Sequence, residues 1–155
     1  MNKVKTGQKV PDFELPATGD TVFRLSDLKG TRVVLYFYPK DSTPGCTLEG
    51  RDFSAKKAAF SRNNTAIFGV SRDSMKAHEK FKSNQKFGFD LLSDADEKVC
   101  KMFDVIKQKT MFGKKVRGIQ RSTFIIDEKG MLRQEWRKVK VLGHAKEVLE
   151  AIKAL

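Results

Sequence analysis

Residues 32–38 read RVVLYFY, and residues 39–63 follow directly as PKDSTPGCTLEGRDFSAKKAAFSRN. The first segment is a dense run of β-branched and aromatic residues without polar alternation. Such a run predicts a strand covered on both faces at the centre of a sheet. In the second segment Ser42 or Thr43 can cap a helix whose first position is Pro44, where the missing N–H of proline costs nothing. We therefore expect a buried strand that leads straight into a helix ending near the end of the second segment.

The rest of the chain continues this alternation. Further strands are predicted at residues 65–71, 89–92, 122–127 and 132–136, and helices at 73–86, 94–103 (capped by Asp94) and 144–155. Strands that alternate with helices are expected to run parallel, and the late hairpin, with Gly130 at its turn, adds an antiparallel edge. The first 30 residues are turn-rich. The pattern predicts an α/β, thioredoxin-like fold over residues 1–155 as a single domain: a central mixed sheet flanked by helices, with an N-terminal extension.

Charge and hydropathy narrow the classes of function. No segment approaches the roughly 18 apolar residues of a membrane helix, and the first residues lack the apolar centre of a secretory signal, so no membrane contact and a cytoplasmic location are expected. A net charge of +12 is compatible with nucleic-acid binding. The basic residues are mostly interspersed with acids, but between Val105 and Ile126 there is no acid, and before Arg121 come Lys107, Lys109, Lys114, Lys115 and Arg117. A solvated loop is the favoured interpretation, and no nucleic-acid partner is expected.

The chain contains only two cysteines, Cys46 and Cys100. Two cysteines do not make a disulfide framework, and with only two histidines they are too few for a zinc site. Cys46 lies in the loop that follows the central strand, where α/β folds place reactive groups. It also lies in the first turn of the predicted helix, whose unpaired N–H groups favour the nucleophilic thiolate. A redox or catalytic thiol is therefore expected at Cys46.

The neighbours of Cys46 suit this chemistry. Pro39 ends the strand because it cannot donate to the ladder, and it can shield the sulfur from water. Thr43 places a hydroxyl one helical turn from the sulfur. The backbone N–H groups of Gly45 and Cys46 can bind an electronegative atom of a substrate, and Glu49 lies on the same side of the helix.

The segments YPKDSTPGCTLE and RSTFIID resemble those of the peroxiredoxins, in particular the bacterioferritin comigratory protein group, also called peroxiredoxin Q. The resemblance covers nearly the whole chain. It implies a peroxidase without metal or other cofactor, in which Cys46 is oxidised by hydrogen peroxide or an organic hydroperoxide to a sulfenic acid. It further implies that Pro39 and Thr43 are loop partners of the sulfur, that Arg121 stabilises thiolate and peroxide, and that Glu49 orients Arg121.

The resemblance leaves the resolving thiol open. Many relatives carry a second cysteine five residues after the first, where this chain has Arg51. Cys100 is the alternative, but it lies beside Val99 and Phe103 and is expected to be packed. We therefore favour regeneration by an external thiol such as thioredoxin, glutaredoxin or glutathione. We also expect the enzyme to be a monomer. A dithiol oxidoreductase is a poor fit, because Thr43 stands where a C-x-x-C motif has its first cysteine.

The remaining notable residues have simpler interpretations. His78 and His144 are expected on the surface of helices, and Trp136 and most phenylalanines in the core. The rival to an enzyme is a thioredoxin-fold interaction protein with a basic surface and no catalysis.

Overall fold

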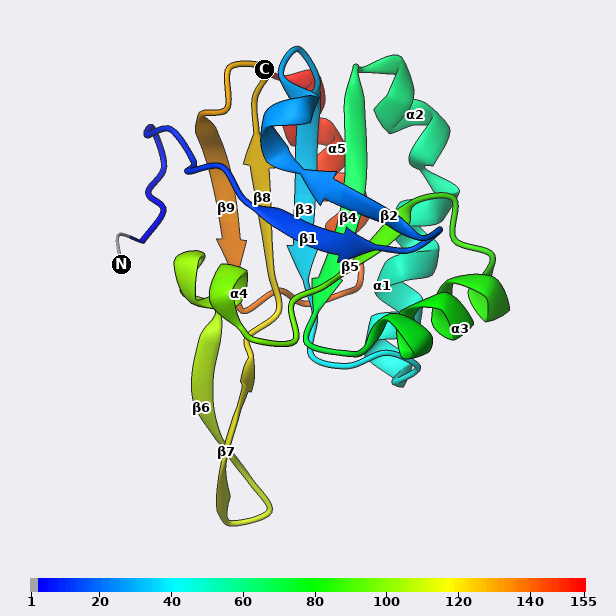
Figure 1. The fold of residues 1–155 in the computed structure, drawn as a ribbon, viewed down its shortest axis with the longest axis vertical. Coiled ribbons are helices and arrows are strands. Elements are labelled where there is room, and N and C mark those ends of the chain that lie inside the picture. The colour runs from blue at the N-terminus through cyan, green and yellow to red at the C-terminus, as the bar shows by residue number, and fades with distance from the viewer. Residues whose placement is uncertain (1–2) are drawn as a thin grey trace.

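The computed structural model describes residues 3–155, apart from the side chain at position 111. Seven strands form the main sheet in the order β2-β1-β5-β4-β3-β8-β9, and β6 and β7 form a separate two-stranded sheet (Figure 1). The strands are β1 (Glu14–Ala17), β2 (Thr21–Arg24), β3 (Arg32–Phe37), β4 (Thr65–Ser71), β5 (Asp90–Ser93), β6 (Ile106–Met111), β7 (Lys114–Ile119), β8 (Ser122–Ile126) and β9 (Leu132–Arg137). The helices are the 3-10 helix η1 (Leu25–Leu28), α1 (Pro44–Ala55), α2 (Lys57–Arg62), α3 (Met75–Gln85), α4 (Lys98–Met102) and α5 (His144–Lys153).

The central strand β3 lies between a parallel and an antiparallel neighbour. It pairs in parallel with β4, from Arg32 opposite Thr65 to Phe37 opposite Val70, and antiparallel with β8. Strand β4 pairs in parallel with β5, and β8 pairs antiparallel with the edge strand β9. Helices α1, α2 and α3 supply the crossovers between the parallel strands. The predicted mixed sheet flanked by helices is confirmed.

Alternate side chains of β3 enter two separate hydrophobic cores. Leu35 and Phe37 belong to the first core, which also holds Phe103 of the segment after α4. Val34 and Tyr36 belong to the second core, together with side chains of α1, α2 and α5. Because both faces of β3 are covered, the strand needs apolar residues at every position, which explains the absence of polar alternation.

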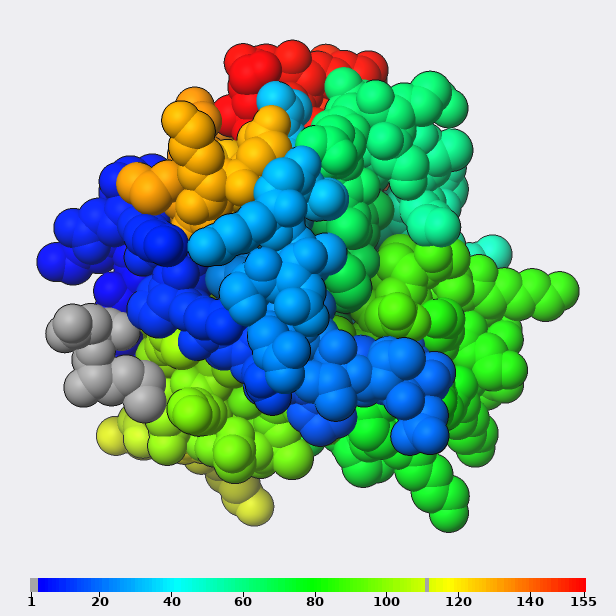
Figure 2. All heavy atoms as spheres, turned by 45° about the horizontal axis from the view of Figure 1, so that its top comes forward, coloured from blue at the N-terminus to red at the C-terminus, as the bar shows by residue number. Residues whose placement is uncertain are grey.

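The N-terminal extension covers the first of these two faces. Strands β1 and β2 form a hairpin, and Phe13 and Phe23 pack into the first core with their ring centroids 5.5 Å apart. Figure 2 shows this segment, in blue, running across the surface between the orange strands and the green part of the chain. Within residues 3–155 no helix has the length and apolar character needed to cross a membrane.

Two predicted helices differ from the observed ones. The helix after β3 is interrupted at Lys56, so that α1 and α2 take the place of one long helix. The helix expected from position 94 begins only at Lys98, because Glu97 adopts a left-handed conformation (φ 66°). Asp94 still serves the start of α4, since its carboxylate accepts the N–H groups of Val99 and Cys100 at 3.2 and 2.6 Å.

The basic segment after α4 is not a loop, and the favoured interpretation of this stretch as a solvated loop is wrong. Strands β6 and β7 pair antiparallel from Ile106 opposite Ile119 to Met111 opposite Lys114. The two residues between them, Phe112 and Gly113, have φ values of 53° and 76°. Two positive φ values are the signature of a two-residue hairpin turn whose twist matches that of the strands. The hairpin projects from the body of the molecule (Figure 1).

Candidate active site

The first turn of α1 carries Cys46 directly beyond the end of β3. Thr43 is the N-cap residue, and the N–H of Thr47 donates to its carbonyl at 2.9 Å. The Thr43 hydroxyl does not cap the helix; it donates to the carbonyl of Lys40 at 2.8 Å. The N–H groups of the first helical residues, Gly45 and Cys46 among them, have no acceptor within the helix. The helix start therefore presents donors and a partial positive charge beside the sulfur.

Arg121 brings a full positive charge to the sulfur. It lies in the short connection between β7 and β8, 75 residues from Cys46 in the sequence, and its Nη2 donates to Sγ at 3.5 Å. The Cys46 side chain is almost inaccessible, at 2% exposure. A thiolate enclosed in this way is poorly hydrated, so the guanidinium and the helix start replace solvent as its stabilising partners.

Glu49 occupies the other arm of the same guanidinium. Nη1 of Arg121 donates to Oε1 of Glu49 at 2.6 Å, and the Glu49 side chain is 1% exposed. Burial raises the pKa of Glu49 to about 7, against the opposite effect of the Arg121 charge. Its second oxygen, Oε2, has no hydrogen-bond partner among the described residues. Two acidic groups, the Cys46 thiol and the Glu49 carboxyl, thus share one cation.

Glycine at position 45 leaves room for this arrangement. A Cβ at Gly45 would lie 3.2 Å from Nη2 of Arg121, which is closer than almost all ordinary contacts. A larger residue would push the guanidinium away from the sulfur. Pro39 lies two residues after the end of β3 and is half-buried, as is Thr43. The structure therefore brings Cys46, Gly45, Glu49 and Arg121 into one cluster, with Pro39 and Thr43 in the loop that leads to it.

A buried polar network, missed from the sequence, holds this loop. Asp41, between Pro39 and Thr43, accepts from the hydroxyl of Tyr38 at 2.6 Å and lies 2.6 Å from Nδ1 of His78. The other ring nitrogen of His78 lies 2.9 Å from the carbonyl of Leu92 and must carry a proton, because a carbonyl oxygen only accepts. A further proton then lies between Nδ1 and the carboxylate.

His78 is completely buried, so the prediction of a surface histidine is wrong. The available signal was its spacing of three residues from Phe81, which is also buried and lies on the same face of α3. The same network contains a cluster of potential metal ligands, since Asp41, Asp73 and His78 place three ligand atoms within 4.8 Å of one another. Both ring nitrogens of His78 are already engaged, so a metal ion would have to displace these hydrogen bonds.

His144 is also buried, at 4% exposure, again contrary to the prediction. Its Nε2 lies 2.7 Å from the hydroxyl of Thr123, and its ring meets those of Phe53 and Trp136 edge-on. Burial lowers the pKa of His144, which favours the neutral ring. This histidine packs the start of α5 against the sheet. Trp136 is half-buried there, and most phenylalanines lie in the cores as predicted, Phe112 being fully exposed.

Cys100 lies on the opposite side of the sheet from Cys46. Cys100 belongs to the first core and Cys46 to the second, and both thiols are free. The Cys100 side chain is completely buried, and burial, together with the charge of Asp94, raises the pKa of its thiol. The predicted packing of Cys100 is therefore observed, and this thiol has little thiolate character.

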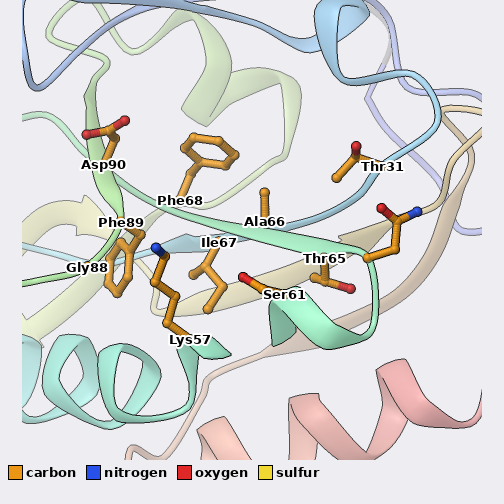
Figure 3. Close-up of a pocket in the computed structure, with 11 residues that line it drawn as sticks. Thr31, Lys57, Ser61, Thr65, Ala66, Ile67, Phe68, Gly88, Phe89 and Asp90 are labelled. Carbon is orange, nitrogen blue, oxygen red and sulfur yellow. The ribbon is translucent and has the colours of Figure 1, made fainter. Parts of the chain in front are cut away.

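One hollow in the described surface is unrelated to the cysteine. It has a volume of about 420 Å³ and is lined by residues of α2, of the first half of β4 and of the segment before β5 (Figure 3). Ala66 and Phe68 lie on one side of β4, and Ile67 lies on the other, together with Lys57 of α2. Because the hollow lies toward the start of β4, whereas Cys46 follows the end of the parallel neighbour β3, the two are at opposite ends of the sheet.

Comparisons with known proteins agree with this geometry. Residues 6–135 match the AhpC/TSA family. Peroxiredoxin Bcp of Xanthomonas campestris is 53% identical over 143 residues, which span 92% of this chain and 89% of that protein. Peroxiredoxin Bcp of Bacillus subtilis is 49% identical over 150 residues, spanning 97% and 96% of the two chains.

A solved structure is equally similar. It shows the Xanthomonas campestris bacterioferritin comigratory protein and concerns the alkyl peroxide reduction activity of that protein. Its sequence is 49% identical, its TM-score is 0.91, and the match covers 97% of this chain and 98% of that one. The chain therefore belongs to the AhpC/TSA family, within its Bcp or peroxiredoxin Q group, and is a thiol-dependent peroxidase.

Proposed function

We propose that Cys46 is the peroxidatic cysteine of this enzyme. Its thiolate attacks one peroxide oxygen, so that Cys46–S⁻ + ROOH + H⁺ gives Cys46–SOH + ROH. Hydrogen peroxide and organic hydroperoxides are the substrates; the alkyl peroxide reduction attributed to the Xanthomonas campestris relative supports the second class. The observation that carries the proposal is the single guanidinium of Arg121, which reaches Sγ of Cys46 with one arm and the Glu49 carboxyl with the other.

Each neighbouring group has one role in this step. The N–H groups of Gly45 and Cys46 bind the peroxide oxygen at the helix start. Arg121 stabilises both the thiolate and the charge that develops on the leaving oxygen, and Glu49 holds Arg121 in place. Thr43 supplies a hydroxyl at the mouth of the loop, and Pro39 limits the access of water to the sulfur.

The oxidised enzyme is regenerated by an external thiol: thioredoxin, glutaredoxin or glutathione. This proposal is supported by the position of Cys100, which lies in the other core, across the sheet from Cys46. A disulfide needs Cα atoms within about 7 Å, and reaching that distance would require the sheet or α4 to unfold. The burial of the Cys100 thiol, which disfavours its thiolate, adds to this argument.

The remaining expectations concern the protein in the cell. We propose that residues 1–155 act as a single-domain monomer in the cytoplasm. Most of the large apolar side chains that are exposed in the described chain lie apart from one another, such as Val22 on β2 and Leu48 on α1; Phe112 and Val116 share the β6–β7 hairpin. Two free cysteines fit a reducing compartment. Sedimentation of the purified protein measures its oligomeric state, and fractionation of cells measures its location.

The test of the catalytic assignment uses Cys46→Ser, Cys100→Ser and the parent. After one equivalent of peroxide, peptide mass spectrometry with a thiol-blocking reagent should find the parent and Cys100→Ser oxidised at Cys46 alone. Cys46→Ser should retain the fold and lose turnover to below a few per cent of the parent rate. An intramolecular disulfide between Cys46 and Cys100, with turnover lost in Cys100→Ser, would overturn the external-thiol cycle.

A further inference from the structure

The β6–β7 hairpin forms an arm beside the active site. Its six paired positions give it a length of about 20 Å at the usual rise of a strand. An isolated two-stranded hairpin is marginally stable in water, so its base must be anchored. Arg117 provides this anchor through two hydrogen bonds to the carboxylate of Glu97, next to α4, and Ile119 is completely buried.

The charges of the arm are neutralised at its base and not at its tip. Arg117 pairs with Glu97, and Lys107 pairs with Asp104 at 3.3 Å. Lys114 and Lys115 are exposed, and within the described residues neither has an acidic group within 4.0 Å. These lysines adjoin the turn at Phe112, which is 99% exposed. Aromatic side chains are enriched at protein interfaces, and unpaired cations beside one can attract a partner of opposite charge.

The base of the arm adjoins the reactive sulfur. Strand β7 ends two residues before Arg121, whose guanidinium contacts Cys46. On β6, Lys109 donates to the carbonyl of Ile119 at 3.0 Å. Burial lowers the pKa of Lys109, the charge of Arg121 lowers it further, and Cys46 acts in the opposite direction. Lys109 is thus held at the base of the arm beside Ile119, two residues before Arg121, and a protein bound along the arm would extend toward the sulfur.

From these observations we infer that the β6–β7 arm is the docking element for the reductant, and that this reductant is an acidic protein carrying a pair of thiols. The inference rests on the proposed regeneration by an external thiol and adds the means of recognition. The tip lysines would attract the acidic surface of the partner, and Phe112 would pack against it.

The chemistry on the docked partner balances without a further reactant. The first thiol attacks the oxidised sulfur, so that Cys46–SOH + R–SH gives Cys46–S–S–R + H₂O. The second thiol of the same partner then displaces Cys46, and Cys46–S–S–R + R′–SH gives Cys46–SH + R–S–S–R′. The peroxide supplies the oxidising equivalents, and the partner leaves as a disulfide.

The test separates the two half-reactions. In Lys114→Glu/Lys115→Glu the charge of the tip is reversed, and Lys29→Glu/Arg62→Glu makes the same change at exposed positions at the opposite end of the sheet. Each protein is first oxidised with one equivalent of peroxide. It is then reduced either with a dithiol thioredoxin of net negative charge or with the small neutral thiol dithiothreitol.

We expect the tip variant to react with thioredoxin at least about tenfold more slowly at low ionic strength, because charge complementarity accelerates association by 10–10³. High salt should reduce this difference, and Phe112→Ser should slow the reaction at all salt concentrations. Reduction by dithiothreitol and oxidation by peroxide should match the parent in every variant. The control variant should match the parent with both thiols.

Three results would overturn the inference. The tip variant could react with thioredoxin at the parent rate, or it could lose reduction by dithiothreitol as well, which would assign the arm to the active site itself. It could also lose binding of a single-stranded oligonucleotide while its thioredoxin rate is unchanged, which would make the arm a nucleic-acid site. A failure of the proposed function would look different, since the parent would then show no oxidation at Cys46 by mass spectrometry.

Discussion

Replacing Glu49 by glutamine tests whether two acidic groups compete for the charge of Arg121. Glutamine keeps an oxygen that can accept the hydrogen bond from Nη1, now 2.6 Å long, and removes only the negative charge. Without that charge the guanidinium is left to the sulfur alone. We therefore expect the Cys46 thiolate to form at a lower pH in Glu49→Gln than in the parent.

The size of the effect follows from the geometry. Sγ and Oε1 contact the two arms of one guanidinium, at 3.5 and 2.6 Å. Their separation is then roughly 5 to 8 Å, and two like charges at that distance repel by about 2–3 kcal/mol at an effective dielectric constant of ~20. This energy corresponds to a shift of up to about two pH units in thiolate formation.

The assay is the pH titration of thiolate absorbance, together with the rate of peroxide reduction at each pH. Glu150→Gln serves as the control, because it makes the same change at an exposed position of α5, where Glu150 pairs with Lys153. At pH values above about 7, where Glu49 of the parent carries its negative charge, Glu49→Gln should contain more thiolate and react faster. A midpoint that stays in place or rises would refute the competition and leave Glu49 as a purely orienting residue.

Three further predictions concern the charge, the loop and the stability of the site. Arg121→Ala should slow peroxide reduction by at least about 10²-fold, and Arg121→Lys should recover only part of the rate, because lysine cannot donate to two acceptors with a planar fork; stopped-flow oxidation measures both. His78→Ala should destabilise the fold by about 3–5 kcal/mol, since it leaves the Asp41 carboxylate buried without its partner; urea unfolding should show this loss, and an unchanged midpoint would contradict the buried pair. Burial raises the pKa of Glu49 from 4.5 to about 7, so the folded state keeps a proton that the unfolded chain releases. The resulting contribution to the free energy of unfolding is complete below pH ~4.5 and is lost as the pH rises through about 7. Unfolding experiments at different pH values should show this loss in the parent and not in Glu49→Gln.

The sequence was informative wherever a local pattern determines the structure. The apolar run of β3 and the strand at 65–71 were predicted almost to the residue, because a strand covered on both faces needs continuous apolar residues. The helix predicted at 73–86 is observed as α3, and the side chain of its N-cap residue Ser74 accepts the N–H of Ala77. Cys46 at a helix start was likewise visible from its flanking residues.

Contacts between distant residues were not visible from such patterns. His78 and Asp41 are 37 residues apart, and a lone histidine on a charged helix carries no sign of its partner. The β6–β7 arm was missed because its strands have few apolar residues and no core to face, so that neither periodicity nor composition indicates a strand. The pairing of Arg121 with Glu49 was expected from the family resemblance, since the 72 residues between them give no spacing rule.

The sheet between the two thiols also affects how long the sulfenic acid at Cys46 persists after a reaction with peroxide. Cys46 and Cys100 lie in cores on its opposite faces, so on the proposed cycle no internal disulfide can form to protect the sulfenic acid. The lifetime of that acid then depends on the supply of outside thiol. When the supply runs short, a second peroxide molecule reaches the same sulfur and carries it to the sulfinic acid, from which ordinary thiols do not recover it. The fraction of protein inactivated in this way records the ratio of peroxide to reductant that the cell has experienced.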